Sequence, residues 1–517
     1  MLLLQTSSEL ASWRRSLPPR GLHFVPTMGA LHRGHLELIQ RAAAPRWWGN
    51  PQVVVSIFVN PLQFGAGEDF ERYPRSLEAD GQLACAAGAD AVFAPSVQEI
   101  YPMGDAGMTH VVPPALLLQS LCACQRPGHF EGVATVVTRL LALVRPERLF
   151  LGEKDWQQLV ILRQVVADLG LPVVIEGMAT VRQEDGLALS SRNAYLNPTE
   201  LKKAATLQGC LASAAGDAHW GIQASDLLNP LEQTLLQHNL RPEYVALVEA
   251  HTLQPMPQLE GMALLAAAVR CGPARLIDHR FLMPRAPIVA IDGPAGAGKS
   301  TVTRALARRL GLTYLDTGAM YRALTWWVLQ QGIDPADPSA VAPLLIGLDL
   351  ALSQNEEGQL LIKVNGYDVT AAIRSPEVTA VVSTVAAHPC VRQSLTSLQQ
   401  RLGERGGLVA EGRDTGTAVF PDAECKIFLT ATVAERARRR AHDLRQQGFA
   451  VPELQELEQQ IADRDAMDSN RSEAPLRQAP DAVLLVTDGM EIEAVIAAMV
   501  DAFRSRVPEE AWPPPSS

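Results

Sequence analysis

The sequence predicts two α/β units joined head to tail, each built on a parallel sheet wrapped by helices. In the first part of the chain, short apolar segments alternate with amphipathic ones, which is typical of parallel sheets. Near residue 178 this alternation gives way to a smaller, helix-rich region. At Ile288 a new strand begins and a second αβ unit follows it, with no internal repeat between the two halves.

The elements of the first unit follow from its apolar segments. We predict strands at 1–4, 23–25, 53–59, 91–93 and 148–151, with helices at 77–87 and 134–144 between them. A domain at 1–178 is then followed by a smaller one at 179–277, which opens with a turn at 184–186 and has its final strands at 244–249 and 263–269. Pro284 and Pro287 mark 278–287 as a linker, and the Pro-rich residues 508–517 are expected to be disordered.

Length and composition are those of a multidomain globular protein. The 517 residues are enough for about three or four domains, and 47% hydrophobic and 20% charged residues are ordinary globular values. A net charge of -11 argues against a broad polyanion-binding surface, so nucleic acid is not an expected partner.

The cysteines and the apolar segments bear on the compartment. Seven cysteines with no CxxC pair indicate thiols in a reducing environment rather than disulfides or zinc ligands. The apolar residues 1–4 are too few for a signal peptide, and no stretch approaches the length of a membrane span. We therefore expect a cytoplasmic protein with no membrane partner.

A phosphate-binding loop opens the second unit. After the strand at 288–291, residues 293–300 read GPAGAGKS, which is GxxxxGK[ST] between a strand and a helix expected at 301–310. Backbone N–H groups of such a loop cradle phosphates at a helix N-terminus. The expected ATP ligands are Gly293, Gly296, Gly298, Lys299, Ser300 and Thr301; Lys299 would reach the β- and γ-phosphates and the Ser300 hydroxyl would bind Mg²⁺.

Three further motifs, at 316–322, 412–421 and 464–471, suggest the phosphate acceptor. Together with 293–300 they resemble the bacterial cytidylate kinase family over residues 288–507, which implies a P-loop nucleoside monophosphate kinase fold. In that family a monophosphate-binding insert would fall at 345–385, with a hairpin at 354–366, and a lid at 440–471. The resemblance implies that CMP is held by Thr317, Arg322, Arg392, Arg413, Asp414, Asp468 and Arg471, and that Arg464 neutralises the transferring phosphoryl group. For the basic run at 436–440, a solvent-exposed helix face explains the sequence at least as well as a site.

A pair of histidines suggests an adenylate-forming site in the first unit. Residues 26–35 read PTMGALHRGH directly after a strand, so His32 and His35 lie where a helix begins. Imidazole N–H groups there can stabilise charge that develops during attack on the α-phosphate of ATP. The HxGH motif marks nucleotidylyl transfer broadly, and a capping or metal-binding pair is the alternative.

Five further blocks, at 58–65, 72–80, 126–133, 151–158 and 189–193, narrow the chemistry. In order and spacing they resemble the pantothenate synthetase family, which implies a Rossmann-like nucleotidylyltransferase domain with a small α+β subdomain. The implied reaction joins pantoate and β-alanine through a pantoyl-adenylate, releasing AMP and pyrophosphate. The implied ATP ligands are Met28, His32, His35, Gly152, Lys154, Asp155, Ser190, Ser191 and Arg192, with His32, His35 and Lys154 as the catalytic groups.

The substrate and metal residues carry over in the same way. Gln63 and Gln158 would bind pantoate, Asp80 is a candidate Mg²⁺ ligand, and His129 would orient a neighbouring group. ATP is the co-substrate of both halves and Mg²⁺ the cofactor, while pantoate, β-alanine and CMP or dCMP are the other small-molecule partners. Such synthetases are typically dimers, so a homodimer is possible. Two alternatives stay open, namely related substrates on the same folds and a non-catalytic half acting as a scaffold.

Overall fold

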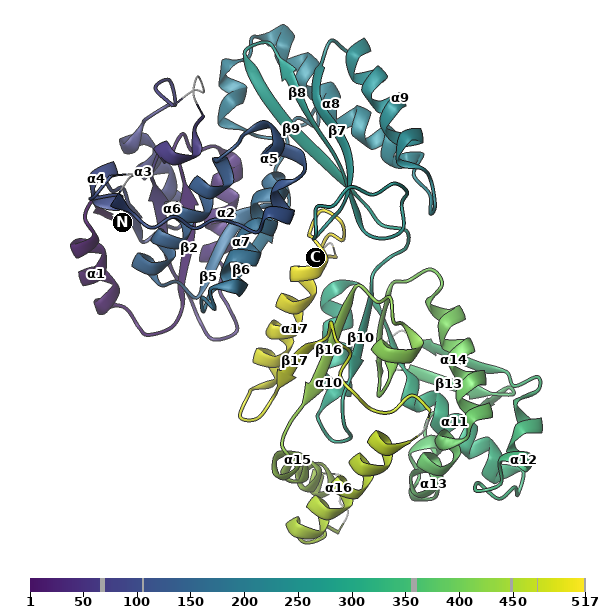
Figure 1. The fold of residues 1–517 in the computed structure, drawn as a ribbon. Coiled ribbons are helices and arrows are strands. Elements are labelled where there is room, and N and C mark those ends of the chain that lie inside the picture. The colour runs from purple at the N-terminus through teal and green to yellow at the C-terminus, as the bar shows by residue number, and fades with distance from the viewer. Residues whose placement is uncertain (66–69, 105–106, 355–359, 447–449, 472, 516–517) are drawn as a thin grey trace. The chain divides into compact units, whose positions relative to one another are not determined.

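The structure is a computed structural model that describes residues 1–65, 70–104, 107–354, 360–446, 450–471 and 473–515 (Figure 1). The chain forms two compact units. Unit 1 comprises Met1–Pro284 and Pro508–Pro513, and unit 2 comprises Arg285–Val507 and Pro514–Ser517.

Unit 1 is organised around a parallel sheet which, in the described part of the chain, has six strands in the order β1-β4-β3-β2-β5-β6. The strand bounds are β1 (Leu2–Leu4), β2 (Leu22–Thr27), β3 (Gln52–Ile57), β4 (Ala91–Phe93), β5 (Arg148–Gly152) and β6 (Val174–Met178). The chain runs outward from β2 to β3 on one side and places β5 on the other. Ligands of such sheets bind where the strand order reverses, beyond the carboxyl ends of the strands.

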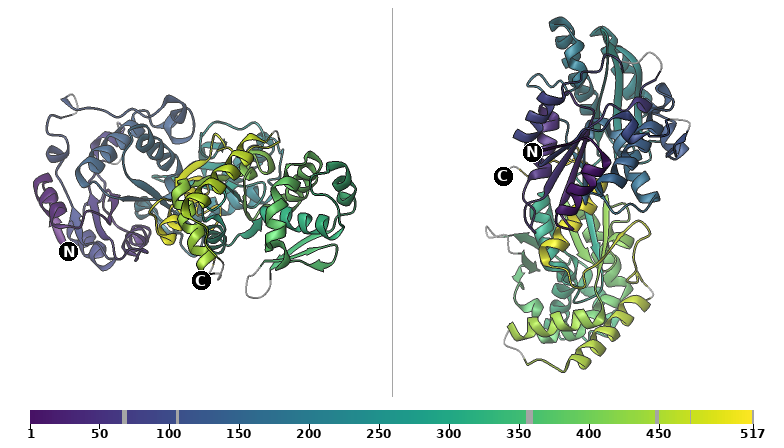
Figure 2. Two further views of the ribbon diagram at one scale, coloured as in Figure 1. Left: turned by 90° about the horizontal axis from the view of Figure 1, so that it is seen from below. Right: turned by 90° about the vertical axis from the view of Figure 1, so that its left-hand side faces the viewer.

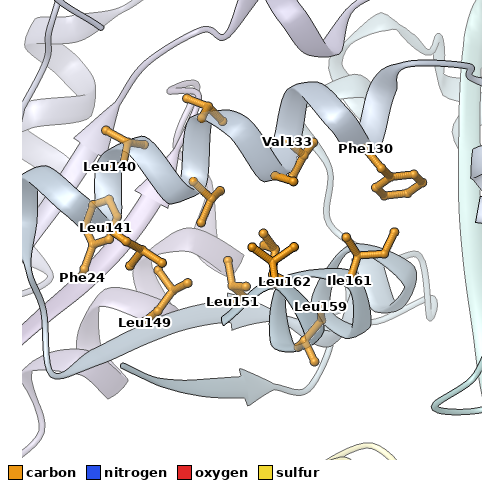
Figure 3. Close-up of a cluster of buried hydrophobic side chains, with 14 of the residues drawn as sticks. Phe24, Phe130, Val133, Leu140, Leu141, Leu149, Leu151, Leu159, Ile161 and Leu162 are labelled. Carbon is orange, nitrogen blue, oxygen red and sulfur yellow. The ribbon is translucent and has the colours of Figure 1, made fainter. Parts of the chain in front are cut away.

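Helices cover both faces of this sheet, which accounts for the nearly continuous burial along β2, β3 and β4. Val25 and Val55 pack with Ile39 of α2 (Arg33–Ala43) in a cluster that also contains Ala84 of α3 (Leu77–Ala86). On the other face, Phe24 and the β5 leucines pack with α6 (His129–Val144) and α7 (Trp156–Asp168) (Figure 3). The remaining helices of this part are α1 (Ser7–Ser16), α4 (Val97–Ile100) and α5 (Leu121–Gln125). The predicted strands and helices are confirmed here with small changes at their ends.

The smaller part of unit 1 is an antiparallel sheet with two helices. Its elements are α8 (Pro198–Gly216), α9 (Ala224–Gln237), β7 (Arg241–Glu249), β8 (Ala263–Cys271) and β9 (Ala274–Leu282). Strand β9 pairs with β8 over its full length, with Ala263 opposite Leu282. The predicted linker at 278–287 is therefore wrong for residues 278–282, because buried side chains there belong to a strand that stops just before Pro284.

The C-terminal residues also differ from the prediction. The expected disorder at 508–517 is wrong for residues 508–513, which pack as part of unit 1. Glu509 is 7% exposed, and its backbone N–H donates to the buried carboxylate of Glu153 at 2.7 Å. A Pro-rich composition removes backbone donors, but here the amides of Glu509, Glu510 and Trp512 and both glutamate side chains are bonded.

Unit 2 is built on a second parallel sheet, ordered β11-β15-β10-β16-β17 over the residues that are described. Its strands are β10 (Ile288–Asp292), β11 (Thr313–Asp316), β15 (Leu408–Gly412), β16 (Cys425–Thr430) and β17 (Val483–Val486). Helices α10 (Lys299–Leu310) and α17 (Ile492–Arg506) pack together. Helices α11 (Thr317–Gln330), α13 (Pro376–Ala387) and α14 (Pro389–Gly403) contribute side chains to the main core of this unit. The β10 segment directly precedes the phosphate-binding loop, as predicted.

The insert and the lid of unit 2 carry structure of their own. Between α12 (Pro338–Val341) and α13 lies an antiparallel sheet of β12 (Leu350–Gln354), β13 (Leu360–Val364) and β14 (Tyr367–Asp368). The predicted hairpin at 354–366 includes β13 but begins later than β12, and residues 355–359 lie outside the described residues. In the lid region, α15 (Val433–Gln446) packs on α16 (Leu454–Asn470) (Figures 1 and 2).

Candidate active sites

The two histidines of unit 1 cap helix α2 in a reciprocal arrangement. His32 Nδ1 accepts the backbone N–H of Gly34 at 3.2 Å, and His35 Nδ1 accepts the N–H of His32 at 3.3 Å. A neutral imidazole whose Nδ1 accepts carries its proton on Nε2. Burial, together with the neighbouring Lys154, lowers the pKa of His32 to about 4, and burial together with His32 and Lys154 lowers the pKa of His35 to about 3. At neutral pH the pair thus offers two uncharged Nε2–H donors beside a helix N-terminus.

The turn that leads into these histidines is held by Asp80. Its carboxylate accepts the backbone N–H of Ala30 at 3.0 Å and of Leu31 at 2.8 Å, and the hydroxyl of Ser76 at 3.2 Å. Ala30 has φ of 51° and Gly29 has φ of 86°, so two successive residues are left-handed. Both carboxylate oxygens of Asp80 are used to fix this strained turn, which supports a structural role, and its role as a Mg²⁺ ligand stays a prediction.

A cavity of about 470 Å³ gathers the other synthetase residues. Its lining includes Lys154, Asp155, Gln158, Ser190 and Arg192. Lys154 and Asp155 follow β5, whose carboxyl end lies at the point where the strand order reverses. The structure therefore brings together side chains that come from two blocks of the sequence separated by about thirty residues.

Of the other predicted residues of unit 1, His129 also lines this cavity, whereas Gln63 and Ser191 are not among its lining residues. Gln63 donates its side-chain N–H to Met28 Sδ at 2.9 Å, and His129 Nδ1 lies 2.7 Å from the backbone oxygen of Gln63. His129 thus contacts the Gln63 backbone, and its orienting role stays a prediction. Ser190 Oγ accepts the N–H of Arg192 at 3.3 Å, and Ser191 Oγ lies 3.4 Å from Tyr73 Oη.

In unit 2, Lys299 is buried and turned onto its own loop. Its Nζ donates to the carbonyl oxygens of Gly293 and Pro294, each at 2.8 Å. Burial, with the nearby Arg413, lowers the pKa of Lys299 to about 7. Gly298, with φ of 82°, precedes Lys299 at the start of α10, so the loop has the left-handed backbone that lets successive N–H groups converge.

Two carboxylates of unit 2 could not be identified from the sequence. Glu411 at the end of β15 accepts the Ser300 hydroxyl at 2.8 Å and the Tyr314 hydroxyl at 2.7 Å. Asp292 at the end of β10 accepts the N–H of Thr415 at 2.7 Å and of Gly416 at 2.8 Å. Each of these carboxylates lies at the end of a central strand of the parallel sheet, and this position is the only sequence feature that suggests a functional residue. Their hydrogen-bond partners are distant in the chain, so the sequence does not reveal them.

Arginines dominate the nucleotide cleft of unit 2, which has a volume of about 2210 Å³. Burial and neighbouring guanidinium groups lower the pKa of Arg322, Arg464 and Arg471. In addition, Arg464 Nε is buried with no hydrogen-bond partner among the described residues. The same cleft is lined by the other predicted nucleotide residues, namely Gly296, Gly298, Lys299, Ser300, Thr301, Thr317, Arg392, Arg413, Asp414 and Asp468. Such a set of facing cations is suited to a polyanionic ligand.

The predicted carboxylates of this cleft are paired with its arginines. Asp414 contacts Arg392 and lies 3.3 Å from Arg471, and Asp468 lies 3.1 Å from Arg413. Thr317 donates its hydroxyl to the backbone oxygen of Glu411 at 2.7 Å. These ion pairs keep the arginines in place without neutralising the whole cluster.

The basic run at 436–440 divides into different roles. Arg436 is buried and forms a two-pronged ion pair with Asp465 at 2.6 and 3.0 Å, while Arg439 donates to the carbonyl oxygen of Ala297 in the phosphate loop at 3.2 Å. Arg438, in contrast, is largely exposed. The solvent-exposed interpretation is therefore correct for Arg438 and wrong for Arg436 and Arg439, because α16 and the loop cover that side of α15.

Known proteins resemble the whole chain. The model of the pantoate-beta-alanine ligase family matches residues 3–281, and that of the cytidylate kinase family matches residues 289–505. A bifunctional pantoate ligase/cytidylate kinase of Parasynechococcus marenigrum (strain WH8102) is 61% identical over 99% of this chain and 100% of its own length. One of the same description from Prochlorococcus marinus (strain MIT 9313) is 60% identical over 97% of this chain and 99% of its own length.

Unit 1 also resembles a solved structure. The crystal structure of pantothenate synthetase from Thermus thermophilus superposes with a TM-score of 0.50 and 47% identity, and covers 54% of this chain and 98% of its own. Within the described ranges, no helix is long and apolar enough to cross a bilayer.

Proposed function

The chain belongs to the bifunctional pantoate ligase/cytidylate kinase family, and from this premise we infer how each unit works. Unit 1 condenses pantoate and β-alanine to pantothenate with conversion of ATP to AMP and pyrophosphate. Unit 2 transfers the γ-phosphoryl group of ATP to CMP or dCMP.

In unit 1 the carboxylate is first activated, because a free carboxylate is a poor acyl donor. A pantoate carboxylate oxygen attacks the α-phosphorus of ATP, and the bond from that phosphorus to the bridging oxygen breaks as pyrophosphate leaves. The amine of β-alanine then attacks the acyl carbon, loses a proton and displaces AMP. No side-chain nucleophile is required in either step.

The observation that supports this assignment is the neutral histidine pair beside Lys154. The Nδ1 atoms of His32 and His35 already accept backbone N–H groups, so each imidazole carries its proton on Nε2. These side chains are therefore oriented before charge develops on the phosphate. Lys154 supplies the positive charge, with Gly152 at the end of β5 and Asp155 directly after Lys154. Ser190, Ser191 and Arg192 would bind the departing phosphates.

The pantoate site would be formed by the two glutamines. Neutral amides bind the substrate hydroxyls and carboxylate without an ion pair that would have to be broken during attack. Gln158 lies in the cavity lining, and the backbone of Gln63 is fixed by His129. This supports the roles proposed for them.

In unit 2 the arginine cluster supports phosphoryl transfer to a nucleoside monophosphate. Arg322, Arg392, Arg413 and Arg471 would hold the CMP phosphate, and Arg464 would stabilise the transferring group. The loop with Lys299 would hold the β- and γ-phosphates of ATP. The carboxylates of Asp414 and Asp468 would accept from the base or the ribose.

The residues around Ser300 fit a magnesium ion. Its hydroxyl and the Glu411 carboxylate are hard oxygen donors 2.8 Å apart beside the phosphate loop, and Mg²⁺ in such sites is held by few protein ligands together with substrate phosphates. When bound, the ion would offset the charge of the β- and γ-phosphates. Among the described residues, no group of three or more His, Cys, Asp or Glu side chains is arranged to hold a metal.

Two assays on the purified full-length protein test the proposal. One follows AMP release that depends on both pantoate and β-alanine, and the other follows ADP formation with CMP, dCMP, UMP or AMP as acceptor. We expect both activities, with cytidine nucleotides preferred by the kinase. A preference for AMP would overturn the acceptor assignment, and a silent half would favour the scaffold alternative.

Assembly and location are part of the same proposal. We propose a homodimer through unit 1, which sedimentation of the full chain tests. Because its substrates are cytosolic metabolites, we also place the protein in the cytoplasm, which fractionation of the source cells tests.

A further inference from the structure

The C-terminal segment, Pro508–Pro513, is bonded into unit 1 through its backbone. The N–H groups of Glu509 and Glu510 donate to the two carboxylate oxygens of Glu153 at 2.7 and 2.8 Å. Glu153 is 1% exposed. Without the segment these two donors would be lost, and a buried carboxylate without donors is costly.

The side chains of the segment make a second set of contacts. Glu509 Oε1 lies 2.8 Å from Arg41, and Glu509 Oε2 accepts the N–H of Ala179 at 3.4 Å. Glu510 Oε1 accepts the N–H of Thr180 at 2.8 Å.

The other oxygen of Glu510 faces the side chains of His279 and Arg182. Oε2 lies 3.5 Å from His279 and 3.9 Å from Arg182, and Arg182 is itself held by a two-pronged ion pair with Asp278. Both glutamate side chains are therefore engaged by backbone donors and by basic groups of unit 1.

The partners of the segment support the elements that carry the phosphate-binding residues. Glu153 directly precedes Lys154, and Arg41 lies in the last turn of α2, the helix that His32 caps. The loop after β6 that contains Ala179 and Thr180 continues to Val181, whose backbone oxygen accepts the N–H of Leu189 at 3.0 Å. Leu189 precedes Ser190. Two loops and helix α2, which carry the residues assigned to ATP, thus share one support.

The carboxylates in this contact need accurately directed partners. Three carboxylates, those of Glu153, Glu509 and Glu510, gather in a buried place, and burial raises the pKa of Glu153 to about 7 although the two backbone donors oppose the rise. The arrangement is stable only when the segment's amides are aimed at Glu153 and its side chains at the surrounding basic groups. A loosely attached tail would not meet these conditions.

We propose that the C-terminal segment is a working part of the pantoate-activating site, with Glu509 and Glu510 as positioning residues for the loops that bind ATP. The proposal rests on the function inferred above. Since the segment follows α17, the last helix of unit 2, the synthetase half is complete only when the end of the chain is present. The chain leaves unit 1 at Pro284 and returns to it at Pro508.

Two truncations of the full chain give the first test. A chain that ends after Val507 loses the segment, whereas a chain that ends after Pro513 keeps it and serves as the matched control. We expect the first to show a KM for ATP in pantothenate synthesis raised by about tenfold or more, with a smaller change in kcat. The kinase constants of both chains should stay within about twofold of the full chain, and the control should match it in both reactions.

Point variants and rescue separate positioning from folding. Glu509→Ala should raise the same KM, and Glu509→Gln, which keeps one acceptor, should lie between it and the full chain. A synthetic peptide of residues 507–515 should restore ATP affinity to the chain that ends after Val507, while the same peptide with both glutamates changed to alanine should not. A truncated chain that fails to fold would not respond to either peptide. In that case the KM for ATP of Glu509→Ala and Glu509→Gln decides between a positioning role and none.

Hydrogen exchange on the full-length protein without substrates tests the docking independently of activity. The amides of Glu509 and Glu510 should be protected to a degree comparable with those of β6. Exchange at the rate of an unstructured peptide overturns the proposal, as does an unchanged KM for ATP in the chain that ends after Val507. If the full-length protein makes no pantothenate but the amides are protected, the proposed function fails and the docking stands.

Discussion

The carboxylate of Asp80 offers a sharp test of how the adenylate-forming site is built. In Asp80→Asn one oxygen remains to accept one of the two backbone N–H groups, and the new amide N–H₂ faces the other. The variant therefore loses one charge-assisted hydrogen bond and leaves one buried donor without its acceptor. Together these should cost about 2–4 kcal/mol of unfolding free energy. The left-handed turn at Gly29 and Ala30 should then relax, and the histidines that follow it should shift.

A second substitution checks the source of the effect. A left-handed alanine costs roughly 1–2 kcal/mol, so Ala30→Gly removes strain at the same turn. The double variant should regain about 1 kcal/mol of the loss caused by Asp80→Asn. Urea unfolding of the full chain measures these changes, with the transition of unit 1 identified by hydrogen exchange of β2.

Catalysis distinguishes a structural Asp80 from a metal ligand. A structural role predicts a KM for ATP in pantothenate synthesis raised by about tenfold, with the Mg²⁺ concentration for half-maximal rate unchanged. A metal role predicts the reverse pattern, in which the Mg²⁺ requirement rises and stability stays within about 0.5 kcal/mol of the starting value. That second pattern would exclude a structural role for the Asp80 carboxylate.

Three other predictions concern single groups. Lys299→Ala should lower kcat for CMP phosphorylation by about 10²–10³-fold and leave pantothenate formation unchanged. Both activities are measured on the same preparation, and loss of both would contradict the view that the two sites are independent. Asp292→Asn should destabilise unit 2 by about 2–4 kcal/mol, because the amide that replaces the carboxylate can accept only one of the N–H groups of Thr415 and Gly416. Thermal unfolding measures the loss, and a change below about 0.5 kcal/mol would contradict the prediction. Burial lowers the pKa of His23 to about 4, so the unfolded chain binds more protons below pH 6.5, and His23 should remove about 1.4 kcal/mol of the stability of unit 1 for each unit that the pH is lowered from 6.5 to 4. His32 and His35 act in the same sense, so His23→Gln should reduce the slope of stability against pH by about 1.4 kcal/mol per pH unit without abolishing it, and an unchanged slope in urea unfolding at several pH values would contradict the contribution of His23.

Motifs whose geometry is local could be predicted from the sequence. The phosphate loop before Lys299 and the histidine pair at the start of α2 depend on a strand, a turn and a helix that are adjacent in the chain. Glycine and capping rules decide such geometry over a few residues. The alternation of strands and helices likewise predicted both parallel sheets, because burial on both faces imposes that pattern.

Contacts between distant residues were decided by the tertiary structure alone. The bonds of Asp80 to the turn before α2, of Ser300 to Glu411, and of Glu153 to the C-terminal segment join positions that only strand order and register bring together. The predictions for residues 278–282 and 508–513 are wrong for the same reason. Nearby prolines suggest a connector, but residues 278–282 pair with strand β8 and the amide of Glu509 bonds to the buried carboxylate of Glu153, which are distant partners. Sequence by itself determined which chemistries the chain carries, and the long-range fold decided which charged groups serve them, because the free energy of a buried charge depends on partners that local sequence does not contain.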